Sequence, residues 1–132
     1  MNVVDSSGWI EFFNASRYGL QFKTVITDTD ALLVPVIALY EVHRVLSRSL
    51  PEAVVNQCLD VMRMGRVLEL SDQRAIAAAE VAQRYRLAMA DAVMYSMALE
   101  FDATFWTQDV DYQGLPKVEY LPNFHESVRR PG

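Results

Sequence analysis

The chain opens with the stretch Val3-Val4-Asp5-Ser6-Ser7-Gly8-Trp9-Ile10-Glu11-Phe12-Phe13. The β-branched Val3 and Val4 predict a short strand, and Ser6-Ser7 offer caps for a helix that runs on through Phe13. Asp5 would then stand at the carboxyl end of a strand. Because ligands of open parallel α/β sheets bind at those strand ends, Asp5 is a candidate site residue. The alternative is that Asp5 only caps the helix.

Length and composition predict one globular domain. The 132 residues are 52% hydrophobic and 22% charged, so we expect a single domain over residues 1–132, with 123–132 as a short tail. The longest apolar run, 31–40, is too short for a bilayer span, which needs roughly 20 residues. Asp5 and Glu11 interrupt any secretory signal. Cys58 is the single cysteine, which excludes an internal disulfide and favours a reducing cytoplasm.

The net charge of -5 argues against a large basic surface for nucleic acid. There are 12 Lys and Arg against 17 Asp and Glu, an excess of five acids. If five carboxylates gather around a cation, the positive and negative charges on the rest of the surface are equal in number. The acidity is therefore compatible with a metal site.

Strands and helices are predicted to alternate along the whole chain. Strands are expected at residues 3–4, 31–34, 67–70, 103–106 and 118–121, and helices at 6–13, 16–28, 35–49, 51–64, 71–85 and 88–101. The apolar run 31–34 ends at Pro35, as in a buried parallel strand followed by a helix. This pattern predicts an α/β fold with a mainly parallel sheet of about five strands.

Three further acidic groups stand in apolar surroundings or at strand ends. Glu41 lies in the apolar helix 36–46, where the alternative is a surface ion pair with Arg44. Asp91 lies between small alanines that would let its helix approach the sheet, and its alternative is an N-cap. Asp109 and Asp111 follow a predicted strand, where the alternative is an ordinary polar turn.

Together these acids predict a metal site. At about 4 Å and an effective dielectric constant near 20, each pair of carboxylates repels by about 4 kcal/mol, so a shared site needs a cation. Oxygen ligands are those that Mg²⁺ or Mn²⁺ prefers, and such an ion beside phosphate oxygens serves phosphodiester hydrolysis.

The motifs Val4-Asp5-Ser6-Ser7, Glu41 on a helix, Ala90-Asp91-Ala92 and Thr107-Gln108-Asp109-Val110-Asp111-Tyr112 resemble those of PIN-domain ribonucleases, specifically the small VapC-type toxins of toxin-antitoxin pairs. The resemblance covers nearly the whole chain, although Trp106 is bulkier than the aliphatic residue expected there.

The resemblance implies a PIN-like domain that acts as a Mg²⁺- or Mn²⁺-dependent endoribonuclease. Asp5, Glu41, Asp91 and Asp109 match the family's acidic quartet and Asp111 an additional acid, while Ser7 and Thr107 match supporting hydroxyls. It also implies an RNA substrate, a cognate antitoxin that binds beside the active site, and a homodimer. Met94, Met97 and Phe101 would serve either that interface or the core.

Candidate contacts to RNA are fewer. Phosphates could meet Arg17, Lys23, Arg44 and Arg48, and bases could stack on Trp9 or Tyr112. The alternatives are solubilising arginines and a Trp9 in the core. His43 points around its helix away from Glu41 and is not assigned as a base.

Three rival interpretations belong to other classes. A receiver-type signalling domain needs an acidic pair after its first strand, where Asp5 is followed by Ser6-Ser7. A haloacid-dehalogenase phosphatase needs Asp-x-Asp there, and Ser7 takes the second position. The third interpretation keeps the PIN fold as a catalytically silent binding module. The intact quartet favours the nuclease.

Overall fold

Five parallel strands form one sheet, in the order β3-β2-β1-β4-β5, in the computed structural model, which describes residues 1–122. The strands are β1 (Asn2–Val4), β2 (Leu32–Pro35), β3 (Arg66–Leu68), β4 (Thr104–Thr107) and β5 (Val118–Tyr120). All four neighbouring pairs run parallel. The predicted α/β class with a parallel sheet of about five strands is confirmed. The expected tail, 123–132, lies outside the described residues.

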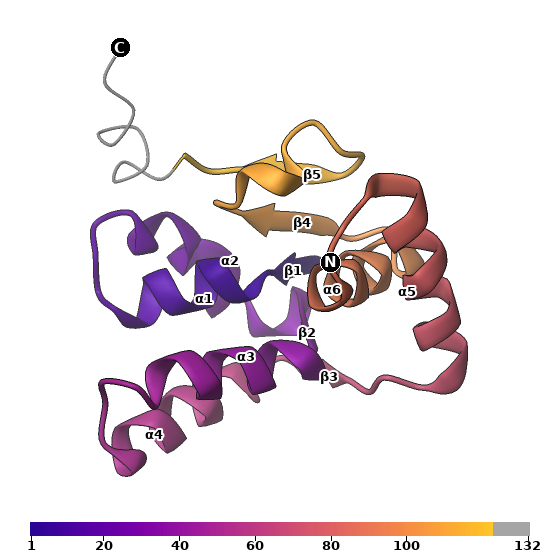
Figure 1. Cartoon of the computed structure of the whole chain (residues 1–132). Coiled ribbons are helices and arrows are strands. Elements are labelled where there is room, and N and C mark those ends of the chain that lie inside the picture. The colour runs from indigo at the N-terminus through magenta and orange to yellow at the C-terminus, as the bar shows by residue number, and fades with distance from the viewer. Residues whose placement is uncertain (123–132) are drawn as a thin grey trace.

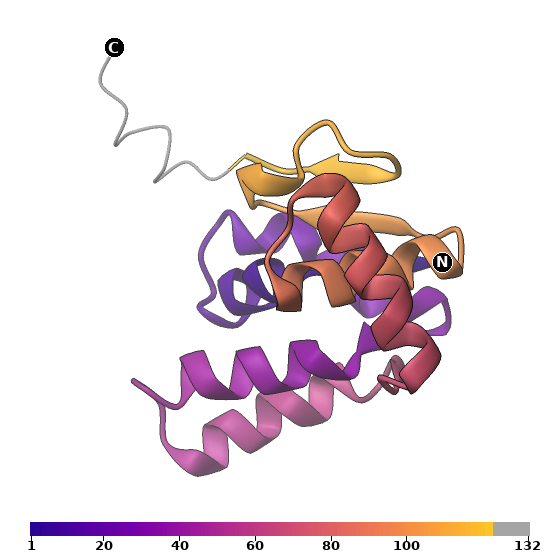
Figure 2. The ribbon, with the colours of Figure 1, turned by 45° about the vertical axis from the view of Figure 1, so that its right-hand side comes forward.

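Helices and short 3₁₀ turns connect the strands. They are α1 (Ser6–Phe13), η1 (Gly19–Phe22), α2 (Lys23–Thr27), η2 (Thr29–Ala31), α3 (Val36–Leu46), α4 (Glu52–Met62), α5 (Asp72–Tyr85), α6 (Met89–Glu100) and η3 (Val110–Tyr112). In Figure 1, α3 and α4 lie together at the lower left and α5 and α6 at the right, with β5 at the top of the sheet. The turned view in Figure 2 shows α5 packed along α6. None of these helices has the length and apolar character that crossing a bilayer requires.

The strand order places a binding crevice beside β1. The chain moves outward from β1 to β2 and β3, then returns to the other side of β1 as β4. The strand order reverses at β1, so the segments that follow β1 and β4 leave the sheet in opposite directions. Their separation opens a crevice at the carboxyl ends of these two strands. A receiver-type domain has the order 2-1-3-4-5 instead, so that rival interpretation is wrong.

Helix α6 is the most deeply buried helix in the described part of the chain. Every residue from Ala92 to Ala98 is buried, and the helix packs on β1, β2 and β4. Met94 and Met97 lie in the core, as the commoner interpretation of these residues expected. Phe101, at the end of the helix, is half-buried beneath the guanidinium groups of Arg66 and Arg74.

Element boundaries differ from the sequence prediction in a few places. The third strand ends at Leu68 because its partner strand β2 ends at Pro35, the residue that pairs with Leu68. Helix α3 ends at Leu46 and α4 at Met62, each about one turn or less before the predicted end. Pro35 is the last residue of β2 as well as the N-cap of α3. Its missing N–H is tolerated there, since a helix leaves its first amides without intrahelical partners.

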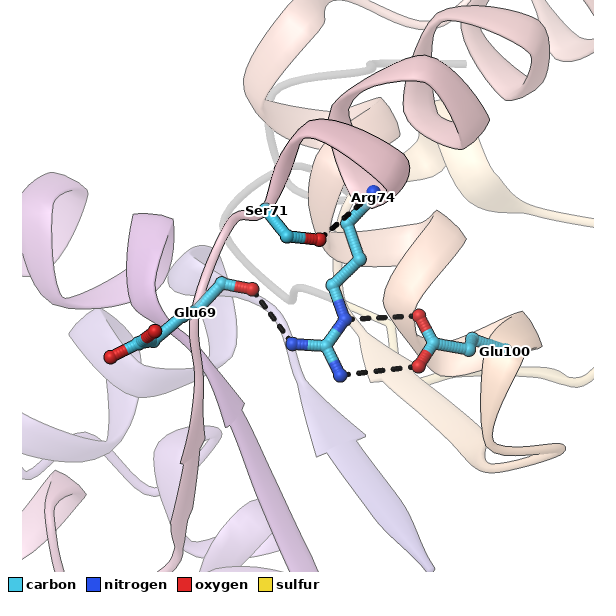
Figure 3. A network of polar contacts seen from close by, with 4 residues as sticks. All are labelled: Glu69, Ser71, Arg74 and Glu100. Atoms are coloured by element: carbon cyan, nitrogen blue, oxygen red, sulfur yellow. Dashed lines mark hydrogen bonds and ion pairs between the residues drawn. The ribbon is translucent and has the colours of Figure 1, made fainter.

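Arg74 ties three segments together at the start of α5 (Figure 3). Its Nε and Nη2 donate to the two carboxylate oxygens of Glu100 on α6, at 3.0 and 3.2 Å. Nη1 donates to the backbone carbonyl of Glu69 at 2.8 Å, and the Arg74 amide donates to the capping hydroxyl of Ser71. A planar guanidinium makes this bidentate contact and a third bond at once, which an ammonium does not.

We therefore expect Arg74→Lys to lower the free energy of unfolding by about 1–2 kcal/mol, because two hydrogen bonds are lost while the charge stays. Denaturant titration measures the change. The matched control is Arg63→Lys, since Arg63 forms an exposed pair with Asp60 one helical turn away and should shift stability by less than about 0.5 kcal/mol. Equal effects of the two substitutions would contradict the structural role of Arg74.

Candidate metal centre

Asp5 is the buried centre of the candidate site. It follows β1, its side chain is 2% exposed, and Oδ1 accepts from the Gly8 amide at 3.0 Å, which makes Asp5 the N-cap of α1 in place of Ser6 or Ser7. The hydroxyl of Ser7 donates to Oδ1 at 2.8 Å, and that of Thr107 donates to Oδ2 at 2.7 Å. The capping interpretation of Asp5 is therefore confirmed, and its role as a site residue stays a prediction.

Glycine at position 8 lets α1 start this close to the strand. A Cβ at Gly8 would lie 2.7 Å from Cγ1 of Val4 and 3.0 Å from the ring of Phe22, both fully buried. Any side chain there would push the first turn of α1 away from β1. The amide of Gly8 would then leave the carboxylate of Asp5.

Burial raises the pKa of Asp5 from the ordinary 3.8 to about 7. Desolvation is the largest cause, because a charged carboxylate loses its hydration inside the protein. The hydrogen bonds from Thr107, Gly8 and Ser7 favour the ionised form and oppose this shift, whereas the charge of Asp109 adds to it.

A second acidic segment follows β4, the neighbour of β1. Thr107 is the last residue of β4, and its hydroxyl accepts from the amide of Asp109 at 2.9 Å while it donates to Asp5. The carboxylate of Asp109 in turn accepts from the amide of Asp111 at 2.9 Å and caps η3. The polar turn considered for this segment is real, and its hydrogen bonds fix the acids in place.

Asp91 reaches the same place from α6. The helix begins at Met89 with Ala88 as its N-cap, so the interpretation of Asp91 as a cap is wrong. Oxygen atoms of Asp91, Asp109 and Asp111 lie within 4.8 Å of one another, and we call these three residues the acidic cluster. Burial raises the pKa of Asp91, and the negative charges of Asp109, Glu41 and Asp111 raise it further.

Glu41 lies beside this cluster without being one of its three members. Its Oε1 accepts from the hydroxyl of Ser6 at 2.7 Å, and its charge acts on Asp91. Within residues 1–122 no ion pair joins Glu41 to Arg44, so the surface-pair interpretation is wrong. The contact with Ser6 spans 35 positions and had no signal in the sequence.

The two aromatic residues considered for stacking on bases are both fully buried. Trp9 packs against Phe13 in the core, and Tyr112 lies between Tyr95 and Phe105. The stacking prediction is therefore wrong for both residues.

The basic candidates are all exposed: Arg17, Lys23, Arg44 and Arg48. His43 is also exposed, on α3. The hydroxyl of the buried Tyr112 donates to the backbone carbonyl of Asp91 at 3.1 Å.

The donor set of the acidic cluster suits a hard divalent cation. Two oxygens on opposite sides of a Mg²⁺ ion lie about 4 Å apart, which the spacing within the cluster allows. The donors are carboxylate oxygens only, which Mg²⁺ and Mn²⁺ prefer over softer metals. A cation would also offset the mutual repulsion that raises the pKa of Asp91.

The raised pKa of Asp5 predicts a pH-dependent stability. The folded state holds the proton of Asp5 up to pH about 7 and the unfolded chain only to about 3.8, so the free energy of unfolding falls as the pH rises between these values. The full loss is about 4 kcal/mol. In EDTA, denaturant titrations at pH 5 and pH 8 should show this fall, and Asp5→Asn should flatten it. An equally steep fall in Asp5→Asn would assign it to other groups.

Several solved structures share the fold of this chain. The solved structures most like this one include a toxin-antitoxin complex from Klebsiella pneumoniae, at 18% identity and a TM-score of 0.76, with 90% of this chain and 96% of that chain covered. VapC20 from Mycobacterium tuberculosis, a Sarcin-Ricin loop cleaving toxin, matches at 18% identity and a TM-score of 0.75, with coverage of 92% and 100%.

VapBC2 from Rickettsia felis, bound to a DNA fragment from its promoter, matches at 14% identity and a TM-score of 0.71, with coverage of 90% and 97%. At these identities the likeness shows the fold alone. No curated protein sequence matches. The profile of the PIN domain matches residues 3–118, which include all five acids of the site. The chain therefore belongs to the PIN domain family.

Proposed function

We propose that this protein is a Mg²⁺- or Mn²⁺-dependent endoribonuclease that hydrolyses RNA phosphodiester bonds as the toxin of a toxin-antitoxin pair. One observation supports this most: carboxylate oxygens of Asp91, Asp109 and Asp111 lie within 4.8 Å of one another, beside the crevice between β1 and β4. A cation would offset the repulsion between like charges held this close, and phosphate oxygens are natural further ligands of such a cation.

In this proposal Asp5, Glu41, Asp91 and Asp109 act in catalysis and, with Asp111, hold the cation. When bound, the cation lowers the pKa of a water molecule and stabilises charge on the phosphate. Ser7 and Thr107 orient the Asp5 carboxylate through their hydroxyl groups. Ser6 does the same for Glu41 through one hydrogen bond to Oε1, whereas both oxygens of Asp5 accept such bonds.

Contacts to RNA are proposed for four exposed basic residues. Arg44 is exposed on α3, the helix that carries Glu41, and Arg48 is exposed just beyond the end of that helix. Arg17 is exposed after α1, and Lys23 is exposed on α2. Guanidinium and ammonium groups in such places hold phosphates without reading the bases. The binding they give should weaken as salt is added.

The proposed partners follow from the related structures. The Klebsiella pneumoniae protein is part of a toxin-antitoxin complex, and VapC20 cleaves the Sarcin-Ricin loop. We propose for this chain a cognate antitoxin and a homodimer. We place its action in the cytoplasm, where the half-buried thiol of Cys58 stays reduced.

Replacing single acids tests the catalytic proposal. Asp91→Asn and Asp109→Asn should each lower the rate of RNA cleavage in Mn²⁺ by about 100-fold, because each removes a charged ligand. Cleavage is followed on labelled RNA by gel. The control is Asp30→Asn, an exposed acid on η2 that should cleave at the wild-type rate. Wild-type rates in both site variants would contradict the nuclease; a wild type that folds and binds Mn²⁺ but cleaves no RNA would favour the binding module.

Thermal stability offers a second test that needs no substrate. Mn²⁺ should raise the melting temperature of the wild type more than that of Asp91→Asn, because a ligand that binds only the folded state stabilises it in proportion to its affinity. At 100 times the dissociation constant the gain is about 2.7 kcal/mol. Differential scanning calorimetry with and without Mn²⁺ measures it. An equal shift in both proteins would place the bound ion elsewhere.

A further inference from the structure

Tyr112 bonds to both segments that carry the acidic cluster. Its amide donates to the backbone carbonyl of Asp109 at 3.2 Å, within the turn that presents Asp109 and Asp111. Its side-chain hydroxyl donates to the backbone carbonyl of Asp91 at 3.1 Å, in the first turn of α6. One residue therefore bridges the loop after β4 and the helix that approaches it.

The ring of Tyr112 has little room to move. It is fully buried, with its centre 4.7 Å from the ring of Phe105 on β4 and 6.0 Å from that of Tyr95 on α6. Aromatic contacts at these separations contribute stability beyond simple burial. The position of the hydroxyl is thus set by the core rather than by the site.

This bond works against the repulsion between the acids. The carboxylates of Asp91, Asp109 and Asp111 repel one another, which favours separation of α6 from the loop. The hydroxyl of Tyr112 holds the loop to the first turn of α6 through the backbone carbonyl of Asp91, and it also interacts with the Asp91 carboxylate. Both contacts keep Asp91 beside the loop that carries Asp109 and Asp111.

We propose that Tyr112 is a positioning residue that sets the distance between Asp91 and the Asp109–Asp111 pair, and thereby the affinity of the acidic cluster for a divalent cation. The inference rests on the proposed function, in which that cluster holds the cation. Groups that orient metal ligands typically change metal affinity by 10–100-fold when removed.

The chain offers a matched control in Tyr95. It belongs to the same aromatic cluster, is fully buried, and its hydroxyl also donates to a backbone carbonyl, that of Pro116. Pro116 lies before β5 rather than on a segment that carries an acid of the site. Tyr95→Phe and Tyr112→Phe therefore remove the same group from the same core, and only the second removes a bond to the cluster.

The experiment measures Mn²⁺ binding to each purified protein by calorimetric titration without RNA, together with its melting temperature. Tyr112→Phe should weaken Mn²⁺ binding by about tenfold, whereas Tyr95→Phe should stay within about twofold of the wild type at a similar loss of melting temperature. In the Asp91→Asn background, Tyr112→Phe should cause little further loss, since Asp91 is the ligand it positions.

The outcomes separate this inference from the function on which it rests. If the wild type binds Mn²⁺ and the two Phe variants bind it equally well, the positioning role is overturned and the cation site stands. If the wild type binds no Mn²⁺, both are overturned. If Tyr112→Phe is unfolded without metal, it is refolded in a stabilising osmolyte such as sucrose and titrated there beside the wild type, and equal dissociation constants for Mn²⁺ overturn the role.

Discussion

The hydrogen bond from the Thr107 hydroxyl to the Asp5 carboxylate is the contact on which the rest of the site depends. It joins the ends of β1 and β4, which are 102 positions apart in the chain and adjacent in the sheet. The pairing of Val4 with Trp106 brings Asp5 beside Thr107. A shift of the register by one residue would turn Thr107 to the other face of the sheet and separate both acidic segments.

Neutral groups hold the acids of this site. Hydroxyls of Ser7 and Thr107 bind Asp5, the hydroxyl of Ser6 binds Glu41, and that of Tyr112 binds the backbone of Asp91. The three ion pairs between side chains of residues 1–122 include none of Asp5, Glu41 and Asp91; they are Arg63–Asp60, Arg74–Glu100 and Lys117–Asp102. Hydroxyl donors fix a carboxylate while leaving its charge in place. The carboxylates therefore keep a negative potential that the proposed cation would neutralise.

Such a concentration of charge opposes folding, and the core beneath it must outweigh that effect. The raised pKa values of Asp5 and Asp91 record the cost, which comes first from lost hydration and then from neighbouring acids. Opposing it are the fully buried strand β2 and the buried length of α6 from Ala92 to Ala98. In the proposed function, this cost is the strain of a site whose charges repel one another until a ligand binds.

The sequence by itself determined the class of the fold and singled out the candidate acids. Alternating strands and helices predicted a parallel α/β sheet, and acids at Asp5, Asp91 and Asp109 stood out because apolar residues or strand ends flank them. Local patterns carry this information, because the helical and strand periods and the caps depend on near neighbours in the chain. The short range of those signals also explains the small errors at the ends of α3, α4 and β3.

Only the tertiary structure decided how the acids are arranged and what supports them. It placed Asp111 with Asp91 and Asp109 in one cluster and left Glu41 beside it, bound to Ser6. It also buried Trp9 and Tyr112, which the sequence had offered as contacts for bases. These outcomes depend on strand order and on contacts between distant segments, for which one sequence holds no local signal. The local sequence around a tyrosine beside an acid is the same whether its ring is exposed or buried. Only the packing of the folded chain decides between the two.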